Sequence, residues 1–200
     1  GKTLTSVNTA AIMASETNSK VILIGSDLRN PQMHKLFGVN KNDSKGVSEI
    51  LYNKEIDTYE KYIKKFGNLN VLFSGSIPPN PTSLLASNSY KDMLNRIKKD
   101  FDTIIIDSAP CLLVSDTLQI TDNVDQVVYM FRANHTDKKL VSYITELHKQ
   151  NKMKNINIVL NAVGNSAKYG YKYGYQYGYK YGYKYGYNYG YGYGYSSKES

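Results

Sequence analysis

Apolar residues along the first 163 positions alternate between a helical spacing and short continuous runs. Leu4, Val7, Ala10, Ala11 and Ala14 follow the helical spacing and predict a helix over 3–18. Further helices are predicted over 46–52, 83–99, 116–121 and 137–150. The short runs predict strands over 21–24, 71–73, 103–106, 126–131 and 156–160, and the first of them is of the kind buried on both faces of a parallel sheet. Because strands alternate with helices, we expect an α/β fold with a parallel sheet and right-handed crossovers.

The C-terminal segment has a different pattern, in which tyrosine alternates with Gly, Lys, Gln or Asn from Lys168 to Tyr195. This segment contains fourteen of the chain's 20 tyrosines and no aliphatic residue, so it cannot form an ordinary core. We therefore expect one domain over 1–165 and a disordered low-complexity tail over 166–200. Self-association of the tail through tyrosine stacking is the alternative.

Length and charge narrow the class of protein. The chain has 200 residues, 41% of them hydrophobic, which suits one domain with an appendage. Its net charge of +8 divides evenly between the tail and the rest of the chain. Because basic and acidic residues nearly balance outside the tail, the charge argues against a nucleic-acid partner. The single cysteine, Cys111, excludes a disulfide framework and any multi-cysteine metal site.

The ends of the chain predict a fragment of a longer protein. No apolar run approaches the roughly 20 residues that span a bilayer. The chain begins with Gly1 rather than Met, so any membrane segment is expected among residues outside it.

Three short segments are candidates for phosphate chemistry. Gly1-Lys2-Thr3 opens a predicted helix and matches the end of the phosphate-loop pattern G-x-x-x-x-G-K-[ST]. Asp107 follows the apolar strand 103–106, where a carboxylate can hold the water shell of Mg²⁺. A helix N-cap or turn residue is the alternative, but the place at the carboxyl end of a central parallel strand favours the magnesium role. Asp27 and Arg29 follow the strand 21–24 and could face the same cleft, or form an ordinary loop ion pair.

Taken together, these segments resemble a known family. The set comprises Gly1-Lys2-Thr3, residues 24–31 (IGSDLRNP), residues 78–81 (PPNP), residues 105–110 (IIDSAP) and the tyrosine-rich C-terminus. It resembles the bacterial tyrosine kinases, the cytoplasmic domains of polysaccharide co-polymerases that control capsule and exopolysaccharide export. The resemblance covers residues 1 to about 163, and it implies a doubly wound, mostly parallel sheet of the P-loop NTPase type. Like that family, this chain contains neither an H-R-D nor a D-F-G triplet.

The resemblance implies roles for individual residues. Gly1, Lys2 and Thr3 would bind the phosphates of ATP, and Thr3, Asp27 and Asp107 would hold Mg²⁺. Lys2, Asp27, Arg29 and Asp107 would form the catalytic set, and Asn161 would lie near the adenine. The phosphate acceptors would be the tail tyrosines, modified between neighbouring subunits: Tyr169, Tyr171, Tyr173, Tyr175, Tyr177, Tyr179, Tyr181, Tyr183, Tyr185, Tyr187, Tyr189, Tyr191, Tyr193 and Tyr195.

The same resemblance implies partners and a location. The protein would associate with copies of itself and with the polysaccharide export machinery. It would lie at the cytoplasmic face of the bacterial inner membrane, tethered by an adaptor segment that precedes Gly1.

Two departures from the family pattern change the expectations. Gly25 stands where the family usually has the first aspartate of its Asp-x-Asp-x-Arg element, which leaves Asp27 as the candidate base. The first strand and most of the phosphate loop would precede Gly1, so we expect a gap in the sheet and weak ATP binding by the isolated 200 residues.

Two other functions remain open at this point. A positioning ATPase of the MinD/ParA type shares the strand-and-loop layout but has no need of a tyrosine array. A non-catalytic scaffold would make Gly25 the mark of a degenerate site. Outside the tail, Tyr52, Tyr59, Tyr62, Tyr90, Tyr129 and Tyr143 are expected to be packing residues.

Overall fold

The described part of the chain consists of seven α-helices, two 3₁₀ helices and six strands. The structure is a computed structural model, and it describes residues 1–16, 18–110, 116–153 and 155–163. The strands are β1 (Val21–Ser26), β2 (Lys64–Phe66), β3 (Leu69–Leu72), β4 (Thr103–Ser108), β5 (Val127–Arg132) and β6 (Ile156–Asn161). The helices are α1 (Lys2–Glu16), α2 (Met33–Leu36), α3 (Val47–Asn53), α4 (Pro81–Leu85), α5 (Asn88–Ile97), α6 (Asp116–Thr121) and α7 (Lys139–Lys149), with 3₁₀ helices η1 (Lys41–Asp43) and η2 (Ile56–Tyr62).

The main sheet has four strands in the order β2-β3-β1-β4. β1 pairs in parallel with β3 on one side and with β4 on the other, and all six of its residues are buried. A strand with neighbours on both sides and helices over both faces has no polar face, which explains its continuous apolar sequence. β1 is therefore the centre from which the neighbouring loops are positioned.

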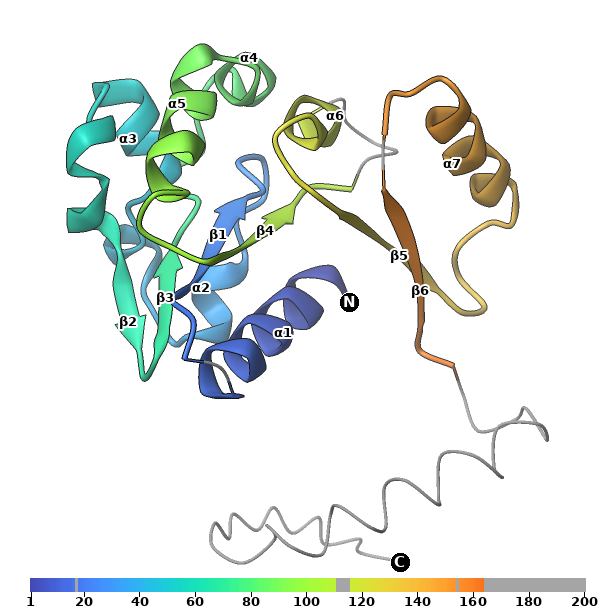
Figure 1. Cartoon of the computed structure of the whole chain (residues 1–200), viewed down its shortest axis with the longest axis horizontal. Helices are drawn as coiled ribbons and strands as arrows, with labels where there is room; N and C mark the ends of the chain where they lie inside the picture. The colour runs from blue at the N-terminus through green and yellow to red at the C-terminus, as the bar shows by residue number, and fades with distance from the viewer. Residues whose placement is uncertain (17, 111–115, 154, 164–200) are drawn as a thin grey trace, which may run out of the picture. The chain divides into compact units, whose positions relative to one another are not determined.

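Helices cover both faces of this sheet (Figure 1). Ile22 and Ile24 pack against residues of α3 and α5 on one face, whereas Leu23 packs with Ala10 of α1 and Met33 of α2 on the other. The alternation follows from the two-residue period of a strand. The doubly wound, mostly parallel α/β fold predicted from the sequence is confirmed.

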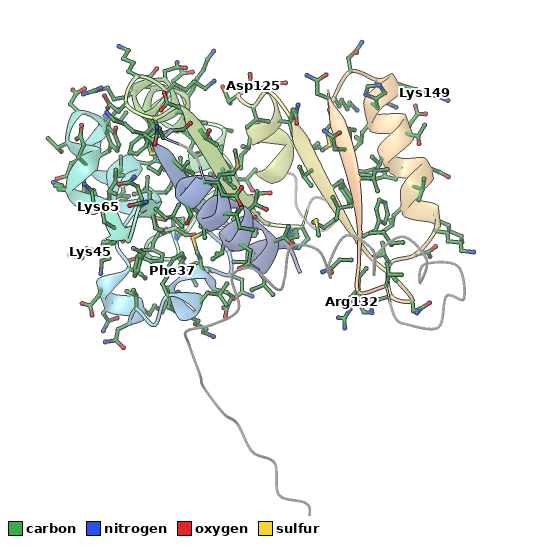
Figure 2. The ribbon with its side chains drawn as sticks, turned by 60° about the horizontal axis from the view of Figure 1, so that its bottom comes forward. Phe37, Lys45, Lys65, Asp125, Arg132 and Lys149 are labelled. Atoms are coloured by element: carbon green, nitrogen blue, oxygen red, sulfur yellow. The ribbon has the colours of Figure 1, made fainter. Side chains whose placement is uncertain are left out.

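Three phenylalanines close one end of the α1-side core. The ring centroid of Phe37, labelled in Figure 2, lies 4.5 Å from that of Phe66 and 5.8 Å from that of Phe73. Gly46, just before α3, lies so close to β3 that a Cβ there would be 1.8 Å from the carbonyl oxygen of Phe73. This contact fixes α3 against the end of β3.

β5 and β6 form a separate parallel pair, joined in register from Val127 with Ile156 to Arg132 with Asn161. α7 packs on this pair through Ile144 and Leu147. Figure 2 shows Arg132 at one end of this layer and Lys149 at the other, as expected when a helix runs back beside the strand that precedes it. Backbone pairing in the described residues does not connect β4 with β5, so the sheet is divided at that point.

The structure corrects the single helix expected over 83–99. That segment forms α4 and α5, separated at Ala86 and Ser87. Ser87 has an extended backbone, and its hydroxyl accepts a hydrogen bond from the Tyr90 N–H at 3.2 Å. This N-cap starts a new helix and ends the one before it.

Four elements were missed, and two tyrosines were misjudged. The sequence did not predict α2, the 3₁₀ helices η1 and η2, or β2, which is antiparallel to β3. Tyr59 and Tyr90 are fully buried as expected, but Tyr52 is 79% exposed and Tyr143 is 38% exposed.

The described residues include no helix that is long and apolar enough to span a membrane. Contacts divide the chain into Gly1–Asn161 and Ala162–Ser200. The expected tail over 166–200, with its predicted disorder, lies outside the described residues.

Candidate nucleotide-binding site

A cavity of about 350 Å³ lies where the N-terminus of α1 meets the carboxyl ends of β1 and β4. Ligands of open parallel sheets bind at this edge. Five of the residues singled out in the sequence line the cavity: Lys2, Thr3, Asp27, Arg29 and Asp107. The fold therefore brings together residues that lie more than a hundred positions apart in the chain.

α1 contributes the cationic side of the cavity. The helix begins at Lys2, and its first turn is closed by a hydrogen bond from the Thr5 N–H to the Gly1 carbonyl at 2.9 Å. The first N–H groups of a helix have no partner within it, and they carry the positive end of its dipole. With the Lys2 ammonium in the same turn, this end of the cavity is suited to an anion such as a phosphate.

Asp107 contributes a buried carboxylate from the end of β4. Its residue is 4% exposed, and its Oδ1 accepts a hydrogen bond from the Ser6 hydroxyl at 3.3 Å. Burial raises the pKa of this carboxyl above its ordinary value of 3.8, and the nearby charge of Asp27 raises it further. Hydrogen bonds from Thr3 and Ser6 and the charge of Lys2 act in the opposite direction and lower the pKa.

Asp27 and Arg29 lie on the loop after β1, which is held by its own polar side chains. Asp27 Oδ1 accepts the Asn30 N–H at 3.0 Å, a side-chain-to-backbone hydrogen bond that closes the loop. The Arg29 guanidinium donates to the Thr82 hydroxyl of α4 at 2.8 Å. The loop is thus tied to the helix that follows the 78–81 segment.

Tyr90 holds the end of β1, from which the same loop begins. Its hydroxyl and that of Ser26, the last residue of β1, are 2.8 Å apart and both residues are buried. Burial raises the pKa of Tyr90 far above that of a free phenol, so the side chain is neutral. This pair fixes the backbone position from which Asp27 projects.

Gly25 lies beside Asp107 in the paired register of β1 and β4. A Cβ at residue 25 would be 2.6 Å from Ser74 Oγ and 2.9 Å from the Ser74 backbone nitrogen, closer than real Cβ contacts. Ser74, which follows β3, also lines the cavity. The space of a side chain at residue 25 is therefore occupied by Ser74.

Gly1 and Asn161 are the remaining predicted site residues. Asn161 ends β6, and its Nδ2 would be 2.9 Å from a Cβ at Gly1. Neither residue lines the 350 Å³ cavity. Both lie beside the start of α1, whose first turn forms part of the cavity wall. The fourteen tail tyrosines lie outside the described residues.

The oxygen atoms of the cavity fit a magnesium ion. Thr3 offers a hydroxyl, and Asp27 and Asp107 offer carboxylates. The described residues hold no cluster of three or more His, Cys, Asp or Glu able to bind a metal. Mg²⁺ is commonly bound by one or two carboxylates together with substrate phosphates and water, so this donor set suits it.

A larger cavity of about 720 Å³ lies between the segment after α2 and the start of β2, with Lys45, Lys61 and Lys64 among its lining residues. It includes none of the predicted site residues. The smaller cavity is the candidate site, because it is lined by both carboxylates and by the first turn of α1.

Sequence reasoning missed Ser6 and Ser74. Ser6 had a signal, since it lies one turn after Lys2 on the same helix face and so reaches Asp107. No feature of the sequence pointed to Ser74, because its place in the cavity depends on how closely the segment after β3 approaches β1.

Comparisons with known proteins cover most of this chain. A family model described as an AAA domain matches residues 1–159. The chain is 36% identical over 165 residues to tyrosine-protein kinase CpsD of Streptococcus pneumoniae serotype 4, which covers 82% of this chain and 71% of that protein. It is 33% identical over 165 residues to tyrosine-protein kinase Etk of Escherichia coli K12, covering 82% of this chain but 22% of Etk.

Solved structures agree with these matches. The kinase domain of Escherichia coli Etk superposes with a TM-score of 0.69 at 32% identity, covering 86% of this chain and 68% of that one. The MinC:MinD complex of Aquifex aeolicus gives a TM-score of 0.64 at 16% identity over 80% of this chain and 63% of that one, a likeness of fold alone.

Proposed function

Because this chain belongs to the bacterial tyrosine kinases of capsule synthesis, within the AAA-domain family, we propose that it transfers the γ-phosphoryl group of ATP to tyrosines of its own tail. The observation that carries the proposal is the meeting of Lys2, Thr3, Asp27 and Asp107 in one cavity. The family binds nucleotide with such a site, and the tail supplies an unusually dense array of phenols.

The nucleotide phosphates lie against the first turn of α1. The Lys2 ammonium contacts the β- and γ-phosphates, and the free N–H groups of the helix end donate to phosphate oxygens. Gly1 would bind phosphate through its backbone, and Asn161, whose Nδ2 would be 2.9 Å from a Cβ at Gly1, would contact the adenine. Arg29, exposed on its loop, provides a second cation for charge that develops on the transferred group.

Thr3, Asp27 and Asp107 are the residues that would hold Mg²⁺. The ion would neutralise charge on the β- and γ-phosphate oxygens. Burial raises the pKa of Asp107 although the charge of Lys2 lowers it, so a further cation beside the buried carboxylate would stabilise its negative charge. The carboxylate is thus prepared for a positive partner.

Asp27 acts as the base in the transfer. The phenolic oxygen of a tail tyrosine forms a bond to the γ-phosphorus, while the bond from that phosphorus to the β,γ-bridging oxygen breaks. ADP leaves with the electron pair of the broken bond, and the phenolic proton passes to the Asp27 carboxylate. Most of the rate comes from positioning and charge stabilisation, so one carboxylate at this place is sufficient.

The acceptors are the fourteen tail tyrosines, presented by one subunit to the cavity of another. Each phosphate adds about −1.5 to −2 charges, so a few modifications turn a tail of charge +4 strongly anionic. Repulsion between such tails would separate assembled subunits. This provides a physical route from phosphorylation to control of polysaccharide polymerisation and export, with the export machinery and a membrane adaptor as partners at the cytoplasmic face of the membrane.

Two alternatives carry less weight. The positioning-ATPase alternative rests on a likeness of fold at 16% identity and leaves the tyrosine array without a role. The scaffold alternative rests on Gly25, although Lys2, Thr3, Asp27 and Asp107 all line one cavity.

Replacing all fourteen tail tyrosines with phenylalanine tests the proposal. We expect intact-mass spectrometry of the full-length protein, after incubation with ATP and Mg²⁺, to detect several added phosphoryl groups in the natural sequence and none in this variant. The matched control replaces the exposed body tyrosines Tyr52 and Tyr143 with phenylalanine and should retain all the additions. Additions that persist in the tail variant would contradict the proposal.

A further inference from the structure

Ser74 occupies the position that a side chain on residue 25 would have. Its Oγ is 2.6 Å from where a Cβ of Gly25 would be, on the sheet face that α1 covers, and its residue is 3% exposed. The same residue lines the cavity with Lys2, Asp27 and Asp107. A hydroxyl from the segment that follows β3 therefore belongs to the same cavity as the two carboxylates.

The backbone of Ser74 is held firmly in this position. Its carbonyl oxygen accepts hydrogen bonds from both the N–H and the hydroxyl of Ser48 in α3, each at 3.0 Å. Glu49 accepts the Ser76 N–H at 3.0 Å and the Ser76 hydroxyl at 2.6 Å. Between them Gly75 has a φ of +85°, a conformation that L side chains rarely adopt. The loop is fixed on both sides of the hydroxyl.

A neutral hydroxyl suits the electrostatics of this place better than a carboxylate would. Asp27 and the buried Asp107 already contribute two carboxylates to this cavity. A third acidic side chain on residue 25, the register partner of Asp107, would add like charge to the same cavity. Serine can donate a hydrogen bond without adding charge.

We infer that Ser74 orients the acceptor phenol for transfer, an inference that rests on the proposed kinase function. The phenolic oxygen has one O–H and two lone pairs. Its O–H points to the Asp27 carboxylate, one lone pair accepts the Ser74 O–H, and the other lone pair faces the γ-phosphorus. Ser74 fixes the direction of attack, while the proton still passes to Asp27 and ADP still leaves with the electron pair of the broken bond.

Replacing Ser74 with alanine tests this role in the full-length protein. We expect kcat for phosphotyrosine formation to fall about tenfold, because one hydrogen bond in the transition state is lost. The KM for ATP and the rate of ATP hydrolysis to water should stay within about threefold, because neither depends on the phenol. Ser44→Ala is the matched control, since Ser44 is also 3% exposed and donates to the Lys41 carbonyl away from the cavity.

Gly25→Ala supplies a second, independent variant. Its Cβ would displace the Ser74 hydroxyl, so phosphotyrosine formation should fall in the natural background and fall little further in the Ser74→Ala background. Equal phosphotyrosine formation by the natural protein and Ser74→Ala would overturn this inference and leave the kinase function intact. A parallel loss of ATP hydrolysis would also overturn it, because the hydroxyl would then act on the nucleotide. Absence of phosphotyrosine in the natural protein would overturn both the inference and the proposed function.

Discussion

Replacing Lys2 with methionine should lower the rate of tail phosphorylation by about a hundredfold or more. Methionine keeps a similar length but removes the one ammonium that α1 places in the cavity with Asp27 and Asp107. That charge stabilises the β- and γ-phosphates, and its loss is felt most in the transition state. Time courses of phosphotyrosine formation at saturating ATP would measure the effect.

The matched control for this experiment is Lys149→Met. Lys149 is an exposed residue at the end of α7 and does not line the cavity (Figure 2). We expect its rate to equal that of the natural protein. A Lys2→Met protein as active as this control would rule out α1 as the phosphate-binding element.

Replacing Asp107 with asparagine should have two effects of opposite sign. The free energy of unfolding should rise at pH 7, because the folded state holds a carboxylate whose pKa is raised mainly by burial. A group with a raised pKa binds its proton more tightly in the folded state than in the unfolded state. Its carboxylate therefore destabilises the fold at pH values above its folded-state pKa, and this penalty disappears below the ordinary value of 3.8.

The same substitution should reduce tail phosphorylation by about a hundredfold, because the amide lacks the charge that would balance Mg²⁺. Urea unfolding at pH 7 and near pH 4 would measure the stability difference, which should shrink at the lower pH. Asp92→Asn, at an exposed position on α5, should change neither quantity. An Asp107→Asn protein that is less stable than the natural one at pH 7 would contradict the electrostatic account of this site.

Much of the fold could be predicted because its strands are unusually apolar. The run that ends at Ile24 is buried by neighbours on both sides, and the run that ends at Ile106 pairs with it along its whole length, so neither sequence carries a competing signal. The P-loop type of fold, expected from motifs at the ends of these strands, is confirmed by the likeness to the Etk kinase domain. β2 was missed because it has three residues, two of them lysines, and is a strand only through its pairing with β3.

The site was less predictable wherever it depends on packing between segments. Asp27 and Asp107 follow apolar strands, so their type and place suggested a shared edge of the sheet. The close approach of Ser74 to Gly25 could not be predicted from the residues around either position. From the sequence alone, Gly25 was interpreted only as the loss of an aspartate. The helix break at Ser87 was also not predictable from the sequence. A serine can lie within a helix or cap its start, and only the hydrogen bond from the Tyr90 N–H to its hydroxyl shows that Ser87 is an N-cap.

A mixing experiment with two inactive full-length variants tests the central claim most directly. One variant has Lys2→Met with its tail tyrosines intact, and the other has an intact cavity with all fourteen tail tyrosines replaced by phenylalanine. After incubation with ATP and Mg²⁺, intact-mass spectrometry should detect no phosphoryl groups on either protein alone. When the two are mixed, phosphoryl groups should appear on the tail of the Lys2→Met protein. A mixture in which that tail stays unmodified, while the natural protein is phosphorylated, would contradict transfer between subunits.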